Sequence, residues 1–229
     1  MNTATPTKVQ VFCGNGLKSV FATLEHELAA KAGASIATSF ASTKVLVDRI
    51  NGGEIPDVAI LTDETIDVLI AQGKLVGPRV DIATAAIGVA VRKGASRPDI
   101  ITTARFVQLL RVVSSIARSK QGISGLHFAD IVKQLGLTDA IASKINIIEG
   151  HAGQACANGE TEIAIQQISE LMPVAGIDIV GPLPDELQKI TMVSAGVSAN
   201  SRARAAAEAV IAYIKSQKDV LRSKGLEPA

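Results

Sequence analysis

Hydrophobic and polar residues alternate along the first third of the chain in a pattern that predicts strands and helices in turn. Residues 8–13 (KVQVFC) are typical of a strand that ends at the glycine turn 14–16, and apolar residues at helical spacing predict a helix over 17–32. The further predicted elements are strands at 34–40, 57–61 and 82–91, the last with a bend at Gly88, and helices at 42–51 and 62–72. Apolar strands that alternate with helices imply a parallel sheet with helices on both faces.

A charged segment at 92–99 separates this run from a second one, and its Gly94 and Pro98 indicate a lobe boundary or an exposed loop. The second run predicts helices at 103–110, 125–135, 151–158 and 166–172, and strands at 111–117, 144–149, 162–165, 176–180 and 189–198. A long Ala-rich helix capped by Ser201 is expected over 201–218, with a short helical tail after it.

Two α/β lobes follow from this order of elements. We expect residues 1–84 and 193–229 to form lobe 1, and residues 85–192 to form lobe 2.

Composition narrows the class of protein. Hydrophobic residues make up 47% of the 229 residues, which excludes a disordered chain. The 23 basic and 22 acidic residues give a net charge of +1, so the chain has no general basic surface and we expect no nucleic-acid partner. Aromatic residues are only 3%, which argues against a platform on which bases or sugars stack.

Neither the cysteines nor the histidines form a metal or disulfide pattern. Cys13 and Cys156 are far apart in sequence, and no two of His26, His127 and His151 have the spacing of metal ligands. We therefore expect neither a metal nor another cofactor.

The sequence shows no membrane segment and no secretory signal. No stretch approaches the roughly 20 apolar residues that cross a bilayer, so no membrane insertion is expected. The N-terminus has no basic region followed by an apolar one. The expected location is the periplasm if a signal peptide has been removed, and the cytoplasm if Met1 is the native start.

Four junctions between a predicted strand and a predicted helix are rich in small polar residues. They lie at 14–18, 39–44, 118–124 and 149–154. In open α/β sheets ligands bind beyond the carboxyl ends of the strands, and backbone N–H groups at a helix start hold anions. Ordinary helix capping is the alternative explanation. The junctions match neither GxGxxG nor GxxxxGK[ST] nor GxSxG, which disfavours a dinucleotide site, a P-loop and a hydrolase elbow.

Three segments carry a resemblance to a known family: VFCGNGLK at 11–18, TSFASTKVLVDRINGGEIPDVAILTDE at 38–64 and SKQGISG at 119–125. In this order they resemble the molybdate-binding type of the type II periplasmic solute-binding proteins, whose second loop reads SFASS. The resemblance spans nearly the whole chain and is most specific in its first third. It implies a two-lobed α/β fold of the periplasmic-binding-protein type, joined by two crossovers, with a ligand cleft between the lobes.

The resemblance also implies which residues bind the ligand. The first-loop serine of the family falls on Gly16, beside Asn15, and the second-loop serine falls on Ser42 or Thr43. The later positions fall on Gln121 and Gly122, on His151 beside Gly150, and on Gln167, where family members often carry a tyrosine.

Departures from the family pattern change the expected ligand. Gly16 lacks a hydroxyl, and Gln167 replaces the tyrosine. Basic groups crowd the same loops, namely Lys18, Lys44, Arg118, Lys120 and His151. Arg and Lys make charge-assisted bonds to carboxylates, so a di- or tricarboxylate is expected rather than molybdate.

Three functions are open at this point. The first is a solute-binding protein that clamps a small anion, carboxylate-bearing or another oxyanion, and works with an ABC permease if it is exported. The second is a cofactor-free isomerase of an unsaturated tricarboxylate, similar to aconitate isomerase, with Glu149 and His151 as its acid and base. The third is a ligand-sensing domain that signals to a partner.

Overall fold

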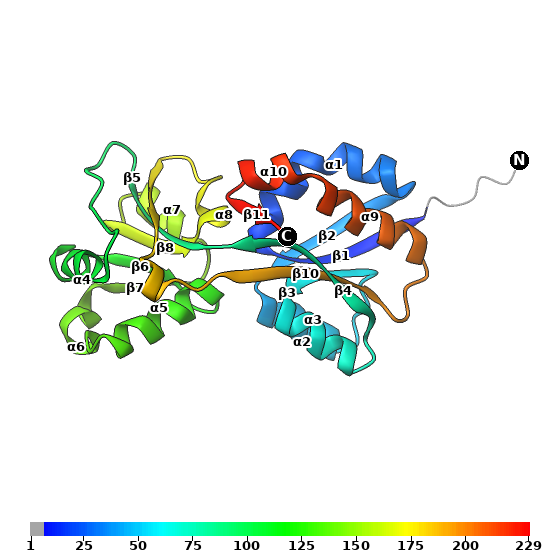
Figure 1. Cartoon of the computed structure of the whole chain (residues 1–229), viewed down its shortest axis with the longest axis horizontal. Coiled ribbons are helices and arrows are strands. Elements are labelled where there is room, and N and C mark those ends of the chain that lie inside the picture. The colour runs from blue at the N-terminus through cyan, green and yellow to red at the C-terminus, as the bar shows by residue number, and fades with distance from the viewer. Residues whose placement is uncertain (1–6) are drawn as a thin grey trace, which may run out of the picture. The chain divides into compact units, whose positions relative to one another are not determined.

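The computed structural model describes residues 7–229 and divides the chain into two compact units (Figure 1). Unit 1 contains residues 7–84 and 191–229, and unit 2 contains residues 85–190. The predicted lobe boundaries were 84/85 and 192/193, and the predicted start of lobe 1 at residues 1–6 lies outside the described residues. Both units are α/β, and the chain passes from one to the other twice.

Unit 1 is built on a six-stranded sheet in the order β11-β4-β10-β3-β1-β2. β1 (Lys8–Gly14) runs parallel to β2 (Ser35–Ala41) and to β3 (Val58–Thr62), whereas β10 (Thr191–Ser198) is antiparallel to β3. β4 (Leu75–Ala85) and β11 (Leu226–Pro228) complete the sheet. The prediction of a wholly parallel sheet is therefore wrong, because β10 returns from unit 2 without a helical crossover in unit 1.

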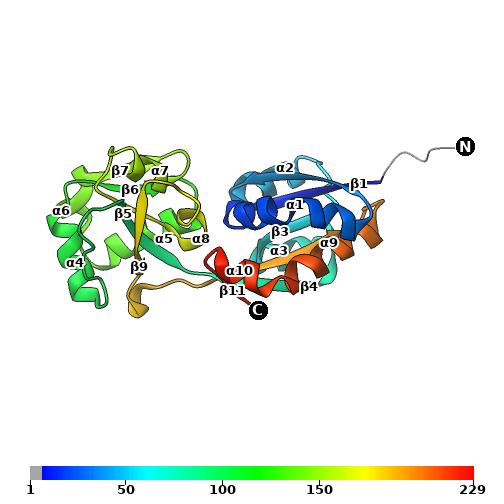
Figure 2. The same ribbon diagram turned by 90° about the horizontal axis from the view of Figure 1, so that it is seen from above.

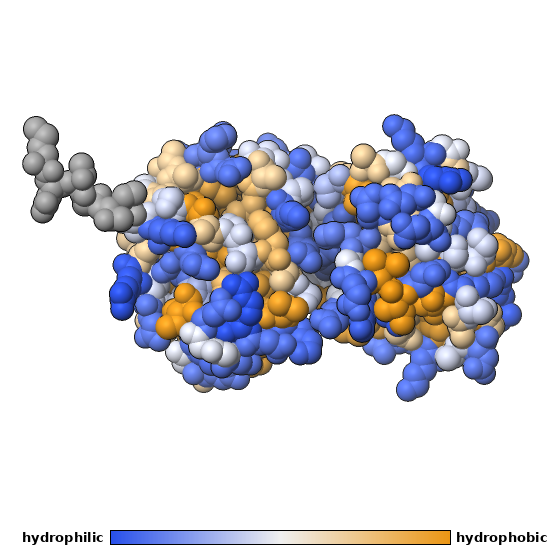
Figure 3. All heavy atoms as spheres, turned by 180° about the vertical axis from the view of Figure 1, so that it is seen from behind, coloured by the Kyte–Doolittle hydropathy of each residue, from blue (hydrophilic) through white to orange (hydrophobic). Residues whose placement is uncertain are grey.

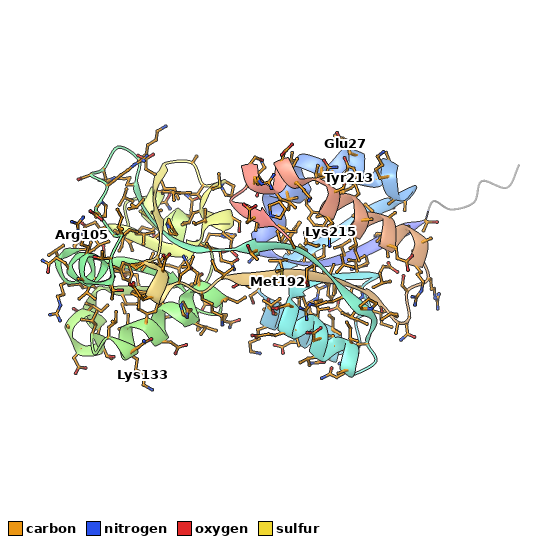
Figure 4. All side chains as sticks on the ribbon, in the orientation of Figure 1. Glu27, Arg105, Lys133, Met192, Tyr213 and Lys215 are labelled. Carbon is orange, nitrogen blue, oxygen red and sulfur yellow. The ribbon has the colours of Figure 1, made fainter. Side chains whose placement is uncertain are left out.

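Helices cover both faces of the unit 1 sheet, as expected (Figure 2). The 3₁₀ turn Asn15–Leu17 leads into α1 (Lys18–Ala32), which lies on one face with α9 (Arg204–Ser216) and α10 (Lys218–Ser223). α2 (Thr43–Asn51) and α3 (Asp63–Ala71) lie on the other face. Figure 4 shows the contact between the α1 and α9 helices, where the Tyr213 hydroxyl donates a hydrogen bond to the Glu27 carboxylate.

Side chains of β1 point alternately to the two faces of the unit 1 sheet and contribute to the hydrophobic core on each face. Phe12 packs with Leu46 of α2 and Ile66 of α3, while its neighbours Val11 and Cys13 point to the opposite face and are fully buried. The guanidinium of Arg49 also lies 4.1 Å from the centre of the Phe12 ring.

Unit 2 has a five-stranded sheet in the order β7-β6-β8-β5-β9. β6 (Ile116–Ser119) runs parallel to β7 (Ile145–Ile148) and to β8 (Ile163–Gln167). β5 (Ile87–Arg92) is antiparallel to β8 and to β9 (Ile177–Pro182). Only β6, β7 and β8 therefore end at a common edge of this sheet.

The two faces of the unit 2 sheet have different cores. One is built from large side chains such as Phe106 of α4 (Thr103–Val112) and Phe128 of α5 (Ile123–Gln134). On the other face α7 (Ala152–Ala157) and α8 (Ile168–Leu171) pack through alanines, Cys156 and Leu171. Small residues let α7 approach the sheet closely, which places the loop before it at the sheet edge.

Several predicted elements differ from the structure. The expected strand over 82–91 is two strands in different sheets, separated at Ala86. The expected strand over 111–117 begins only at Ile116, because residues 111 and 112 continue α4. Two short elements were not predicted, α6 (Thr138–Ile141) and β11.

Two side chains also have other roles than predicted. Gln166 lies in β8 rather than at the start of a helix. Ser201 does not cap α9, whose N-cap is Ala203; the Ser201 hydroxyl donates instead to the Asp57 carboxylate at 2.6 Å. The hydrogen bond to the charged Asp57 carboxylate is therefore favoured here over the helix cap that serine often forms.

On the face shown in Figure 3, hydrophilic and hydrophobic residues are interspersed over each unit. Within residues 7–229 no helix combines the length and the apolar character needed to cross a bilayer.

Candidate functional site: two sheet edges

In unit 2 the carboxyl ends of β6, β7 and β8 lie at one edge of the sheet. Ser119 pairs in register with Ile148, and Arg118 pairs with Ile165. We call residues 119–122, 149–151 and 166–170 the unit 2 edge. It contains five residues predicted to bind ligand or to act as acid and base, namely Gln121, Gly122, Glu149, His151 and Gln167.

Glu149, a predicted acid or base, is held in an ion pair. Its Oε1 lies 2.6 Å from Nζ of Lys120, which belongs to the loop after β6. Both side chains are mostly exposed, at 71% for Glu149 and 55% for Lys120. An exposed pair of this kind contributes little to stability.

Arg118, a predicted carboxylate ligand, folds back on the start of α5. Its guanidinium donates to the carbonyl oxygens of Ser119, at 3.2 Å, and of Gly125, at 3.3 Å. Its Nε is buried and has no partner among the described residues. The structure therefore shows Arg118 stabilising the loop, and its contact with a ligand stays a prediction.

The first turn of α5 is wrapped closely around Ser119. A Cβ added at Gly125 would lie 2.0 Å from the Ser119 carbonyl oxygen, and one at Gly122 would lie 2.4 Å from its hydroxyl. No side chain caps this helix, whereas Thr102 caps α4 by accepting from the Arg105 amide at 3.3 Å. The α5 amides and the buried Ser119 hydroxyl, which has no hydrogen-bond partner within residues 7–229, are therefore donors suited to an anion.

A buried glutamine joins the start of α7, the loop before α7, and α8. Gln166 is 1% exposed, and its Oε1 accepts a hydrogen bond from the Gly153 amide at 3.1 Å. Its Nε2 lies 3.4 Å from Nδ1 of His151 and donates to the Glu170 carboxylate. Gln166 and Glu170 were not among the predicted site residues.

Glu170 is a buried carboxyl of this edge, and its pKa is shifted. Burial raises the pKa of its carboxyl, and the hydrogen bond from Gln166 opposes that rise only in part. A carboxyl of this kind can exchange a proton closer to neutral pH than an exposed one. The sequence held a signal for it, because Gln166 and Gln167 interrupt the apolar strand IAIQQ, but the predicted helix over 166–172 obscured it.

In unit 1, β1, β2 and β3 also end together. Gly14 pairs in register with Ala41, and Cys13 pairs with Ile60. We call residues 14–19, 41–44 and 62 the unit 1 edge. It contains six further predicted ligand residues, namely Asn15, Gly16, Lys18, Ser42, Thr43 and Lys44.

Hydroxyl groups at the unit 1 edge differ in what they bind. Thr62 caps α3 by accepting from the Thr65 amide at 3.4 Å. Ser42 is the N-cap residue of α2, yet its side chain makes no capping bond, and the buried Ser19 hydroxyl has no partner among the described residues. The capping alternative for Ser42 is therefore wrong, and two hydroxyls remain available to an anion.

The two lysines of this edge also differ. Nζ of Lys44 forms an ion pair with Asp48, one turn further along α2, at 2.6 Å. Lys18 is exposed at the first residue of α1 and makes no ion pair within residues 7–229. Lys18 is thus the more available cation.

Within the described residues, the structure offers neither a reactive thiol nor a cluster of metal ligands. Burial raises the pKa of Cys156 to about 11 and raises the pKa of Cys13 further, so both thiols stay protonated at neutral pH. Among residues 7–229, no group of three or more His, Cys, Asp or Glu side chains could hold a metal ion.

Two α/β units, each with parallel strands that end at helix N-termini, define a two-lobed fold of the periplasmic-binding-protein type. Residues 9–227 match the model of the bacterial extracellular solute-binding proteins, and the chain belongs to this family. The expected resemblance is confirmed at the level of family and fold.

Solved structures share this fold. The periplasmic molybdate-binding protein of Azotobacter vinelandii aligns with a TM-score of 0.77 and 19% identity, over 95% of this chain and 98% of that chain. The sulfate-binding protein of Mycobacterium tuberculosis aligns with a TM-score of 0.74 and 14% identity, over 97% of this chain and 87% of that chain. Identities this low show the fold alone.

A relative with higher identity is an enzyme. The aconitate isomerase of a Pseudomonas species is 33% identical to this chain over 190 residues, which cover 81% of this chain and 72% of the relative.

Proposed function

We propose that this chain binds a small anion bearing carboxylate groups, and that the unit 1 edge and the unit 2 edge, each taken by itself, offer donors for such an anion. One observation carries the proposal: α2 and α5 begin at these edges without a side-chain cap, beside the hydroxyls of Ser42 and Ser119. Uncapped amides and nearby hydroxyls are the groups that bind an anion in place of a cap. An exported form of the chain would deliver its anion to an ABC permease.

Charge at the unit 1 edge favours a carboxylate over a metal oxyanion. The Lys18 ammonium makes no ion pair with any residue from 7 to 229, so it can pair with one carboxylate of a ligand while the neutral donors bind another. The molybdate-binding and sulfate-binding proteins named above support anion binding by the fold in general terms.

Titration calorimetry with trans-aconitate, citrate, succinate, molybdate and sulfate tests this proposal. We expect at least one tricarboxylate to bind more tightly than either inorganic anion. Lys18→Ala in unit 1 should weaken that binding about 10- to 100-fold, as the loss of a charged hydrogen bond does. Lys44→Ala is the matched control and should change affinity less than about threefold, because Lys44 already pairs with Asp48.

Ser119→Ala tests the contribution of unit 2. It removes a buried hydroxyl that has no partner in the described structure, so we expect unchanged or higher stability together with weaker binding. Binding of molybdate or sulfate but of no carboxylate would contradict the proposed ligand class. Full affinity in Ser119→Ala would remove this group from the site.

A second candidate function is cofactor-free isomerisation of an unsaturated tricarboxylate. The aconitate isomerase relative favours it, and Glu170 supplies a proton-exchanging carboxyl at the unit 2 edge. In this reaction a base removes a proton from the CH₂ carbon next to the double bond. The electron pair shifts to form the new double bond, and a proton returns to the far carbon. The helix N-termini at the unit 2 edge would stabilise the negative charge that develops meanwhile.

Proton NMR of trans-aconitate or cis-aconitate with the protein in D₂O distinguishes the two functions. Growth of a second isomer that contains deuterium would establish the isomerase. Line broadening reversed by a competing carboxylate, with no new species, would establish binding alone.

A further inference from the structure

The hydrogen bonds of Gln166 determine which way its side-chain amide faces. The Gly153 backbone N–H can only donate, so the atom 3.1 Å from it must be the acceptor Oε1 of Gln166. The Nε2 group, with two hydrogens, then faces the Glu170 carboxylate and Nδ1 of His151. A flipped amide would place two donors against each other at Gly153.

Packing around Gly153 prevents this arrangement from relaxing. Gln166 is 1% exposed, so its amide cannot exchange these partners for water. A Cβ added at Gly153 would lie 3.0 Å from Leu171 and 3.3 Å from Val174, so glycine lets the start of α7 approach this closely. The Gly153 amide is thereby held against Oε1 of Gln166.

We propose that Gln166 is a positioning residue that sets the tautomer of His151, with the proton on Nε2 and the lone pair of Nδ1 facing the Gln166 amide. The Gln166 donor at 3.4 Å is compatible with an unprotonated Nδ1 and repels an Nδ1–H group. In this tautomer the N–H donor of the His151 ring is Nε2. The Glu170 carboxylate, the other partner of the same amide, accepts its second N–H.

This inference concerns the protein without ligand and stands whether or not the proposed functions do. The test is a long-range ¹H–¹⁵N correlation spectrum of the uniformly ¹⁵N-labelled protein near pH ~8, where an ordinary imidazole is neutral. Such a spectrum shows which ring nitrogen of each histidine carries the proton.

The chain supplies two internal references for this spectrum. Nε2 of His127 lies 2.8 Å from the carbonyl oxygen of Leu187, which can only accept, so His127 carries its proton on Nε2. His26 is exposed on α1 and should show the exchange average of both tautomers. His26→Gln and His127→Gln variants assign the signals.

We expect the His151 signals to match those of His127, with an unprotonated Nδ1. Gln166→Glu keeps an acceptor for Gly153 and presents an oxygen to His151, so the proton should move to Nδ1. Gln166→Met presents neither donor nor acceptor, so the share of the tautomer with the proton on Nε2 should fall. Glu170→Gln is the matched control and should leave the tautomer unchanged, because a carboxamide oxygen still accepts from Gln166.

Three results would overturn the inference. They are a proton on Nδ1 of His151 in the unmodified chain, an average identical to that of His26, and a tautomer that survives Gln166→Met unchanged. If Gln166→Glu does not fold, the spectrum of the unmodified chain and that of Gln166→Met decide.

Discussion

Nζ of Lys120 lies 2.6 Å from Oε1 of Glu149, so an ion pair connects the loops that follow β6 and β7 at the unit 2 edge. The Glu149 carboxylate is mostly exposed to solvent, and its partner is this ammonium. Glu170, at the same edge, is buried and carries a raised pKa. The two carboxyls therefore differ in burial and in their partners, and Glu170 is the one that we expect to transfer a proton.

Replacing each carboxyl in turn should separate their roles if the chain is an isomerase. We expect Glu170→Gln to lower kcat about 100-fold or more, the usual contribution of a general acid or base. Glu149→Gln should stay within about threefold, because it breaks only an exposed ion pair. Initial rates from the D₂O experiment on trans-aconitate measure both. A loss confined to Glu149→Gln would restore Glu149 as the base.

The pH dependence of stability should reveal Glu170 independently of any ligand. Its pKa is higher in the folded chain than in the unfolded one, so folding takes up a proton and the free energy of unfolding decreases as pH rises between the two values. Glu170→Gln should therefore be more stable than the unmodified chain at pH ~7, by about 1.4 kcal/mol for each unit of pKa difference. The difference should vanish below pH ~4, where both states carry the proton. Urea denaturation at several pH values measures it.

Asp81 of unit 1 offers a control with the opposite sign. Hydrogen bonds from Ser194 and Arg79 lower its pKa, so its contribution to stability is present above the ordinary range of an aspartate and is lost as pH falls through its folded pKa. Asp81→Asn should be less stable than the unmodified chain at neutral pH and should approach it in acid. If the stability of Asp81→Asn and that of Glu170→Gln, each relative to the unmodified chain, changed with pH in the same direction, the opposite pKa shifts of the two groups would be contradicted.

The order of elements could be predicted because it rests on local patterns. A strand such as residues 8–13 and the helix after it differ in the spacing of their apolar residues, and that spacing is visible within one short segment. The direction of β5 and β10 could not be predicted in the same way. Strand pairing joins residues far apart in sequence, such as Val197 with Val58, and no local pattern encodes it.

For the candidate site, too, local features could be predicted and contacts between distant residues could not. The loops at both edges were predicted, because small polar residues after an apolar strand are a local signal. The Gln166 network was missed, because its partners come from α7, the loop before α7 and α8. The pairing of Lys120 with Glu149 was missed for the same reason, since these residues are far apart in sequence.

Ser42 and Thr102 are both N-cap residues, yet they should respond differently to alanine. The Thr102 hydroxyl caps α4, so Thr102→Ala should cost about 1 kcal/mol of stability and leave ligand affinity unchanged. Ser42 makes no capping bond, so Ser42→Ala should change stability by less than about 0.5 kcal/mol and weaken binding of the carboxylate found by calorimetry. Thermal unfolding and calorimetry on both variants test this. A Ser42→Ala variant with full affinity would show that its hydroxyl is outside the site.

Gly125 and Gly150 provide the last matched pair, which tests the close turn at the start of α5. Alanine inside a helix is normally more stable than glycine by about 1 kcal/mol. At Gly125 its Cβ would lie 2.0 Å from the Ser119 carbonyl oxygen, a backbone atom that cannot rotate away. We therefore expect Gly125→Ala to lose about 1–3 kcal/mol and to bind the anion more weakly, because the α5 amides must shift.

At Gly150 an added Cβ would meet no atom within 4 Å, so Gly150→Ala should change stability by no more than about 0.5 kcal/mol. This control separates crowding at Ser119 from a general intolerance of alanine at the unit 2 edge. Urea denaturation measures the stability of both variants, and calorimetry measures their affinity. If Gly125→Ala were as stable as Gly150→Ala and bound the anion equally well, the tight packing of α5 around Ser119 would not be what positions the anion-binding amides.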